Sequence, residues 1–207
     1  MSTPNLHLFV LVVPLLSALA VNLWGRNNRQ MIAPLVLGSL AFSVLGSIVV
    51  MGNVLRHGTI SYTVGNWQPP FGIELIIDPL SAMMMVLISV VALLASFSSL
   101  KSAEQELPGR EAFFFTLYLI LIAGLHGLVL TGDAFNLYVL LEITSITSYG
   151  LIAMGRGRAA LSSFNYIIMG TIGACFYLLG VGYIYILTGT LNMADIARIL
   201  PTLNAPV

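Results

Sequence analysis

The stretch GDAFNLYVLLEITSITSYG, from Gly132 to Gly150, decides how the rest of the chain is interpreted. After a polar start it is mainly apolar, and about 20 such residues suffice for a helix to cross the hydrocarbon core of a bilayer. One carboxylate, Glu142, lies near its middle. An ionisable side chain at that depth is costly and usually serves a function. The stretch therefore predicts a membrane helix with a functional acid.

The composition extends this prediction to the whole chain. Of its 207 residues 58% are hydrophobic and 8% charged, and the mean hydropathy is +0.97. A soluble domain carries about 25% charged residues, so residues 1–207 are expected to form a single transmembrane domain in contact with the lipid bilayer. The formal net charge of zero argues against a nucleic-acid partner.

Six apolar segments are long enough to span a membrane. Their expected ranges are 6–24, 31–54, 78–100, 113–131, 134–154 and 159–187. A short amphipathic helix is expected over 193–200. The first segment lacks the basic start of a signal peptide and is expected to be retained. The fold class predicted is an all-α integral membrane bundle of six transmembrane helices.

Local signals mark the connections between these spans. Asp78 followed by Pro79 predicts a capped helix start, and Asn192 predicts another. The alternating residues 60–64, followed by Gly-Asn, indicate a short strand or hairpin at a membrane face. The polar residues 101–111 are interpreted as a solvated turn without a site.

The basic residues of the loops predict the orientation. Six of them fall in the loops after the first, third and fifth spans, and two fall on the opposite side: Arg26, Arg29, Lys101, Arg110, Arg156 and Arg158 against Arg56 and Arg198. Because positively charged loops stay in the cytoplasm, the chain is expected to be multi-pass in a prokaryotic cytoplasmic (inner) membrane with its N-terminus outside. Glu142 then lies close to mid-membrane.

Glu142 shares a helix face with side chains three, four and seven residues away. These include Tyr138, Ser145 and Tyr149, whose hydroxyls suggest a hydrogen-bonded path. On one interpretation Glu142 is a proton or cation relay. On the other it is a neutral carboxyl that joins two helices by a hydrogen bond.

Three further polar residues have two interpretations each. His126 is either a proton relay or a packing residue satisfied within the bundle. Asp133 either caps the helix that starts after it or takes up ions at the outer surface. Asn165 is either a helix-to-helix hydrogen-bonding residue or part of a relay.

The sequence has none of the motifs that are typical of soluble enzymes. It has no glycine-rich phosphate loop after a strand, no Cys/His metal spacing and no nucleophile paired with a base. We therefore expect no cofactor and no metal site. Whether the protein is part of an enzyme stays open, with a transporter subunit favoured.

Several stretches, taken together, resemble a known family. In collinear order they are Gly72–Ile73 with Asp78–Ala82, Thr131–Val139 with Glu142, Thr147–Tyr149, and Thr188–Asp195. They are similar to the D-type subunit of Mrp-type multisubunit cation/proton antiporters, to which the proton-pumping membrane subunits of respiratory complex I and membrane-bound hydrogenases are related.

The resemblance implies a fold of about fourteen transmembrane helices in two inverted repeats, each with a broken helix, of which this chain is the first half. It also implies that Glu142 is the ion-path glutamate of helix 5, paired with a lysine on helix 7. The chain departs from the pattern of this family at two points. Asn165 occupies a position where many relatives carry lysine, and Lys101, in a loop, is the only lysine. A fragment and a naturally split subunit are both expected alternatives.

The function expected is a membrane subunit of a cation/proton, most simply sodium/proton, antiporter that works with other membrane subunits. The alternative is a proton-translocating subunit of a complex I-like NADH:quinone oxidoreductase or a membrane-bound hydrogenase. A third possibility is a structural membrane scaffold without its own ion path.

Overall fold

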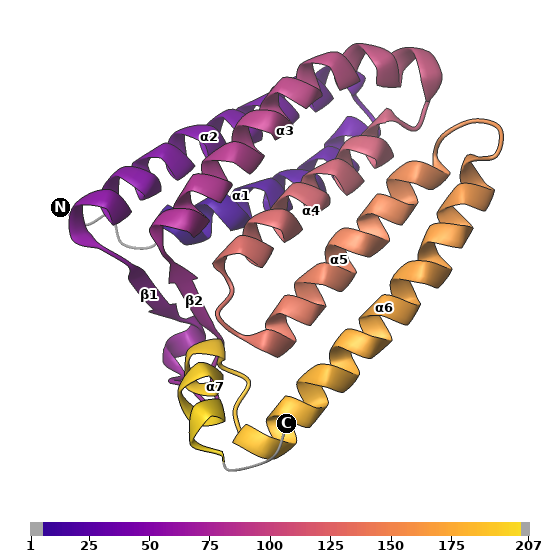
Figure 1. Ribbon diagram of the computed structural model, residues 1–207. Coiled ribbons are helices and arrows are strands. Elements are labelled where there is room, and N and C mark those ends of the chain that lie inside the picture. Colours follow the sequence, from indigo (N-terminus) through magenta and orange to yellow (C-terminus); the bar gives the residue numbers. More distant parts are fainter. Residues whose placement is uncertain (1–5, 204–207) are drawn as a thin grey trace.

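The computed structural model describes residues 6–203 and consists of six long helices, one short helix and a two-stranded sheet (Figure 1). The long helices are α1 Leu6–Ala20, continued by a π-helical turn Val21–Gly25, then α2 Ile32–His57, α3 Pro79–Glu106, α4 Glu111–Leu130, α5 Ala134–Ala153 and α6 Ala159–Thr188. All six are long and apolar enough to cross a membrane. The predicted all-α bundle of six transmembrane helices is confirmed.

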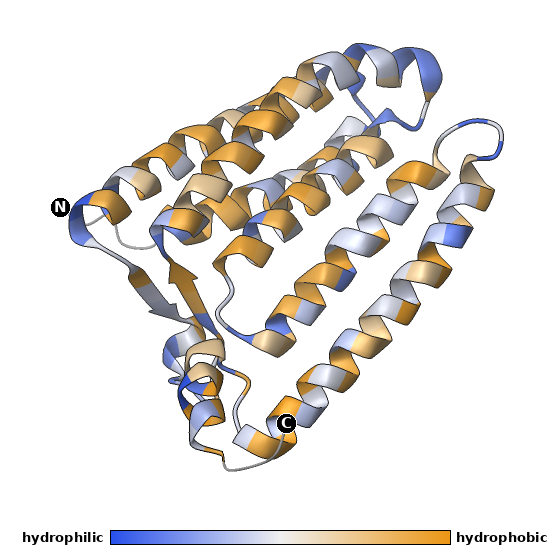
Figure 2. Ribbon diagram, viewed as in Figure 1, coloured by the Kyte–Doolittle hydropathy of each residue, from blue (hydrophilic) through white to orange (hydrophobic). Residues whose placement is uncertain are grey.

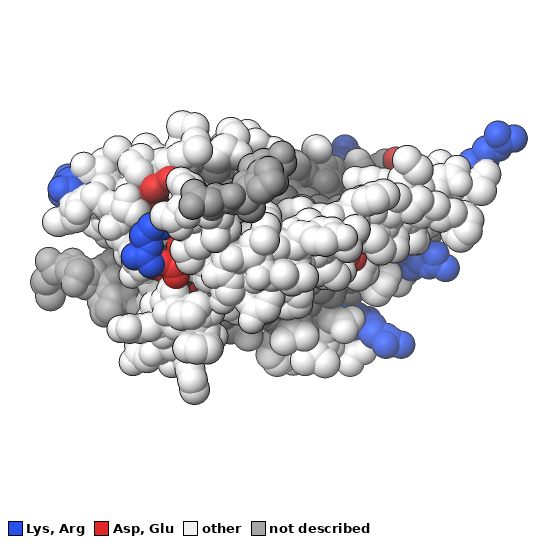
Figure 3. All heavy atoms as spheres, turned by 60° about the horizontal axis from the view of Figure 1, so that its bottom comes forward, with Lys and Arg blue, Asp and Glu red and all other residues white. Residues whose placement is uncertain are grey.

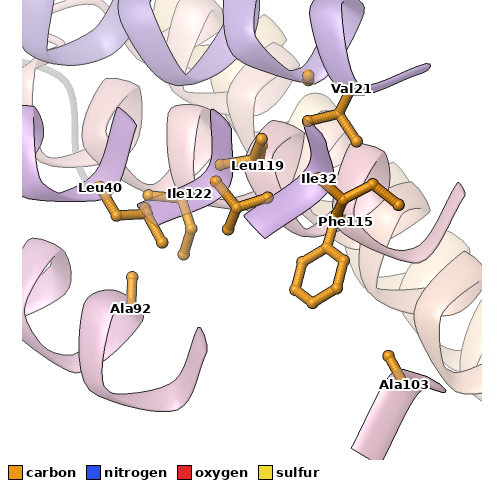
Figure 4. Packing of buried hydrophobic residues seen from close by; sticks show 10 residues of the cluster. Val21, Ile32, Leu40, Ala92, Ala103, Phe115, Leu119 and Ile122 are labelled. Carbon is orange, nitrogen blue, oxygen red and sulfur yellow. The ribbon is translucent and has the colours of Figure 1, made fainter. Parts of the chain in front are cut away.

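Helices α1 to α4 pack together, whereas α5 and α6 lie side by side along one flank of this group (Figure 1). Near the α1–α2 link the core is a cluster of buried side chains that includes Val21, Leu40, Phe115 and Leu119 (Figure 4). A second cluster, with Val10, Leu75 and Leu130 among others, joins side chains of a strand to those of the helices. The outward surfaces of the helices are also apolar, and polar residues concentrate at their ends (Figure 2). This is the distribution that a lipid environment requires.

Capping side chains begin three of the helices. Asp78 accepts a hydrogen bond from the Ser81 N–H, with Pro79 in the first turn of α3. Asn192 accepts from the N–H groups of Ala194 and Asp195 at the start of α7, Met193–Ile199. The two caps predicted from the sequence, Asp78 and Asn192, are confirmed. Each satisfies first-turn N–H groups that have no partner inside the helix.

One connection differs from the sequence-based expectations, and another agrees with them. Helix α3 continues to Glu106 rather than ending near residue 100, because Lys, Ala, Glu and Gln are good helix formers and the first breaker is Pro108-Gly109. The short strand or hairpin predicted at residues 60–64 is present. The strand β1 Ile60–Thr63 pairs antiparallel with β2 Glu74–Ile77, with Ile60 opposite Ile77 and Thr63 opposite Glu74. Between them Gly65 and Asn66 adopt left-handed conformations.

The two ends of the bundle differ in charge and in structure (Figure 3). We use the term hairpin face for the end that contains the sheet, α7 and the α4–α5 link. We call the other end the basic face because it carries Arg26, Arg29, Lys101, Arg110, Arg156 and Arg158. On the face that Figure 3 shows, the surface between the two ends is almost free of charged side chains.

On the hairpin face, three segments far apart in the sequence meet. The N–H of Gly132 donates to the carbonyl of Glu74 at 2.8 Å, and the N–H of Met193 donates to the carbonyl of Gly132 at 2.8 Å. The Asn192 side chain donates to the Glu74 carboxylate at 2.7 Å, and Ser61 donates to its other oxygen at 2.5 Å. The ends of α4, α5 and α6 are thereby fixed to β2.

Candidate functional site

Glu142 lies in the ninth position of α5, half-buried and away from both ends of the bundle. Every other Asp, Glu, Lys or Arg of the chain belongs to a loop, a cap, the terminal turns of a helix or, for Glu74, the first position of β2. Within residues 6–203 no hydrogen bond or ion pair to the Glu142 carboxylate is recorded. Its carboxylate is therefore available to a partner or an ion.

The face of α5 that carries Glu142 packs against α6. One turn toward the hairpin face, Tyr138 stacks on Tyr177 of α6, with ring centroids 6.4 Å apart. Two turns toward the basic face, Tyr149 meets Tyr166 edge-on, with centroids 4.8 Å apart. Because residues at these spacings share one side of a helix, Glu142 lies between two aromatic contacts that hold α5 against α6.

Gly170 of α6 accommodates the end of the Tyr149 side chain. A methyl group at this glycine would overlap the Tyr149 hydroxyl, and it would lie 3.0 Å from the carbon that bears the hydroxyl. Tyr149 is buried, and the Ser163 hydroxyl donates to its backbone carbonyl at 2.8 Å. This side chain is thus held firmly between the two helices.

The positions of Ser145 and Asn165 neither support nor exclude a role in an ion path. Ser145 is half-buried on the side of α5 that carries Glu142, one turn toward the basic face. Asn165 is exposed near the start of α6. For both residues a part in an ion path stays a prediction.

His126 lies in a different part of the bundle. Its Nε2 is 2.9 Å from the Ser89 hydroxyl of α3, and both side chains are fully buried. Ser89 also donates to the Met85 carbonyl at 2.8 Å. Since a hydroxyl has one proton, His126 is the donor in its contact with Ser89. Its Nδ1 is buried without a hydrogen-bond partner among the described residues. His126 is thus only partly satisfied within the bundle, and a relay role for it stays a prediction.

The α4–α5 contact explains why the structure does not bring His126 and Glu142 together. Gly127 and Gly124 of α4 lie against Leu140 and Thr144 of α5. These two residues stand two positions before and after Glu142, and two positions correspond to about 200° around a helix. Glu142 therefore points away from α4.

Asp133 is buried where α4 passes into α5. Its carboxylate accepts a hydrogen bond from the N–H of Asn136 at 2.7 Å, which caps α5. Its backbone also pairs with that of Asn192. The arrangement agrees with the capping interpretation, and ion uptake by Asp133 stays a prediction.

Sequence reasoning misjudged Glu111. We expected residues 101–111 to form a solvated turn, but the Glu111 side chain is only 5% exposed and its Oε1 lies 3.1 Å from a guanidinium nitrogen of Arg29. The expectation was wrong because the α1–α2 link folds over the start of α4. No pattern in the sequence connects two residues so far apart along the chain.

Comparisons with known proteins agree with this architecture. Residues 131–206 match the family described as NADH:quinone oxidoreductase/Mrp antiporter, transmembrane. NADH-quinone oxidoreductase subunit N of Desulforudis audaxviator is 41% identical over 99% of this chain and 41% of its own length. The D-type Na(+)/H(+) antiporter subunit of Alkalihalophilus pseudofirmus is 38% identical over 75% of this chain and 32% of its own length.

Among solved structures, a chain of the membrane-bound sulfane sulfur reductase, an archaeal respiratory membrane complex, superposes with a TM-score of 0.90 at 34% identity. The match covers 97% of this chain and 41% of that one. The chain thus spans about two-fifths of the length of these relatives. In sequence and in fold it resembles part of the antiporter-like membrane subunits that Mrp antiporters share with NADH:quinone oxidoreductases.

Proposed function

We propose that this chain is part of an antiporter-type subunit of the cytoplasmic membrane, and that Glu142 is the group in it that binds and releases protons. The observation that carries the proposal is the isolation of Glu142 among six apolar helices. A carboxyl at such depth destabilises the protein in lipid unless it is paired or protonated, and such residues generally mark ion pathways.

The surroundings of Glu142 suit a protonation site. Tyr138, Ser145 and Tyr149 supply hydroxyls on its side of α5, and hydroxyls both donate and accept hydrogen bonds. Tyr149, seven residues further on, lies about 10 Å along the helix from Glu142. A proton path toward the basic face requires at least one water between these two groups.

The ion exchanged for protons is proposed to be sodium, in an assembly with other membrane subunits. The name of the Alkalihalophilus relative, a Na(+)/H(+) antiporter subunit, supports this choice. In such an assembly a cationic side chain from outside residues 1–207 would pair with the Glu142 carboxylate.

The test measures sodium-driven proton movement in vesicles that contain the complete complex with Glu142→Gln. We expect loss of transport, because the amide has nearly the shape of the carboxyl but cannot ionise. Glu142→Asp is the matched control, since it keeps the acid and should keep partial activity. Assembly of each variant is checked by co-purification. Full transport by an assembled Glu142→Gln complex would remove Glu142 from the mechanism.

A second candidate is the same subunit in a redox-driven pump. It is favoured by the names of two relatives, an NADH-quinone oxidoreductase subunit and a respiratory complex. Co-purification distinguishes the two: partner subunits that carry flavin or iron–sulfur clusters support the pump, and their absence supports the antiporter. If the chain is only a structural scaffold, Glu142→Gln should either impair assembly of the complex or have no effect. It should not abolish transport in a complex that still assembles.

A further inference from the structure

A polar recess of about 380 Å³ opens on the basic face where α1, α2 and α4 meet. It is lined by Asn22, Gly25, Arg26, Arg29, Gly109, Glu111, Ala112 and Phe113. One membrane span ends beside it and two begin there. The recess therefore lies at the level of the lipid headgroups, not within the apolar part of the bundle.

Two arginines give the recess its charge. Arg29 lies 3.1 Å from the buried Glu111 carboxylate, which fixes its position, yet 61% of the Arg29 side chain is exposed. Arg26 is exposed, and within residues 6–203 no hydrogen bond or ion pair of its side chain is recorded. Two positive charges and one negative charge leave the recess with a net charge of about +1.

The start of α4 adds hydrogen-bond donors to the recess. Arg110, the residue before this 20-residue helix, makes no side-chain capping bond in the described part of the chain. Ala112 and Phe113 in the first turn line the recess. First-turn N–H groups have no partner inside the helix and carry a partial positive charge, so they favour an anion.

The surroundings of the recess are apolar and aromatic. Leu23 and Trp24, which belong to the π-helical turn beside Arg26, are 66% and 61% exposed. Phe113, which lines the recess, is 52% exposed. Aromatic side chains at this level are typical of the boundary between headgroups and acyl chains. A ligand with a phosphate and a hydrocarbon tail would contact both kinds of surface.

We propose that this recess binds the phosphodiester group of an anionic phospholipid, with Arg26 and the first turn of α4 as its principal donors. Basic pockets between membrane helices are known to hold such headgroups. The net charge of the recess matches the single negative charge of a phosphodiester better than the roughly −1.5 of a phosphate monoester. Arg29 stays paired with Glu111 and offers its remaining N–H groups.

The test measures lipid binding to the purified complex by native mass spectrometry. It compares short-chain phosphatidylglycerol, phosphatidylcholine with the same chains, and inorganic phosphate. We expect Arg26→Gln to weaken the tightest phosphatidylglycerol adduct roughly tenfold, as the loss of one charge-assisted hydrogen bond predicts. Arg158→Gln is the matched control, since Arg158 is exposed on the same face but does not line the recess.

Asn22→Trp provides a second variant, because it fills the recess and leaves both arginines in place. We expect it to displace the same adduct. Equal losses in Arg26→Gln and Arg158→Gln, or retention of the adduct by Asn22→Trp, would show diffuse surface attraction and overturn the proposal. Binding of inorganic phosphate as tight as that of the lipid, with the same dependence on Arg26, would make it a free-anion site and overturn the lipid assignment.

Discussion

Gly170 shows how much a single residue without a side chain determines near Glu142. The Tyr149 hydroxyl lies where a side chain at position 170 would be, so this glycine sets how closely α5 and α6 approach at the basic-face end of the Glu142 face. Other glycines of α6 do not have this role. A methyl group added at Gly180 would meet no atom within 4 Å.

We expect Gly170→Ala to reduce both stability and transport. The added methyl group must push Tyr149 aside, and overpacking of this kind costs about 1–3 kcal/mol. Gly180→Ala is the matched control in the same helix and should change neither property. Thermal unfolding of the complex in detergent and vesicle transport measure the two effects.

Combining Gly170→Ala with Tyr149→Phe separates packing from chemistry. Removing the hydroxyl relieves most of the overlap, so the double variant should recover stability while its transport stays at the level of Tyr149→Phe alone. Full recovery of transport in the double variant would show that the hydroxyl has no part in the ion path.

For individual residues, the sequence predicted part of the candidate site. The i−4, i+3 and i+7 spacing placed Tyr138, Ser145 and Tyr149 on the side of Glu142, as the structure has them. The spacing could not show which neighbouring helix this side meets, because helix periodicity carries no information about tertiary contacts. For the same reason, neither the direction of His126 nor the Glu111–Arg29 pair was predictable.

Among the elements, helix starts were the most predictable because capping is a local interaction. Asp78 and Asn192 act on N–H groups two or three residues away. The Gly65-Asn66 signal after β1 predicted a hairpin. It did not predict the register of β1 on β2, because the loop between the two strands is too long for its turn type to fix the pairing.

The cap on α3 should show a defined pH dependence. The Ser81 N–H holds the pKa of Asp78 below its ordinary value of 3.8. A lowered folded-state pKa means that the stabilisation is present above the ordinary pKa and is lost as the pH falls through the folded-state value. The carboxylate thus stabilises α3 at neutral pH and ceases to do so in acid.

We expect Asp78→Ala to lower the free energy of unfolding by about 1 kcal/mol at neutral pH, as loss of a cap does. The difference from wild type should shrink below pH 3.8. Asp78→Asn keeps an acceptor for the Ser81 N–H and should be nearly as stable as wild type at every pH. Thermal unfolding in detergent between neutral and acid pH measures this, and a constant difference for Asp78→Ala would contradict it.

The whole molecule combines a well-packed group, α1 to α4, with a flank of two helices. Among the described residues of α6 only Ser163 and Val181 are buried. The sequence predicted six spans but not this division, because an apolar side chain suits both a lipid-facing and a packed helix surface. The two flanking helices, α5 and α6, are in fact the least apolar of the six. The sequence also gave no sign that three separate motifs meet on the hairpin face, where Glu74 is bonded to the α4–α5 link and to Asn192.

The unequal charge of the two faces predicts the orientation of the molecule. With six of the eight arginines and lysines on the basic face, we expect this face in the cytoplasm and the hairpin face outside. The test uses a Cys175→Ala background, since Cys175 is the single cysteine. Ser102→Cys on the basic face and Thr59→Cys on the hairpin face replace exposed residues of similar size.

A membrane-impermeant thiol reagent applied to right-side-out vesicles should label the cysteine at position 59. The cysteine at position 102 should react only after the vesicles are opened. The opposite pattern would reverse the orientation, and the proposed path from Glu142 past Tyr149 would then lead to the outside. Labelling of both positions in closed vesicles would mean that the membrane is leaky or the insertion mixed, and the sealed fraction, measured with an internal marker, distinguishes these two cases.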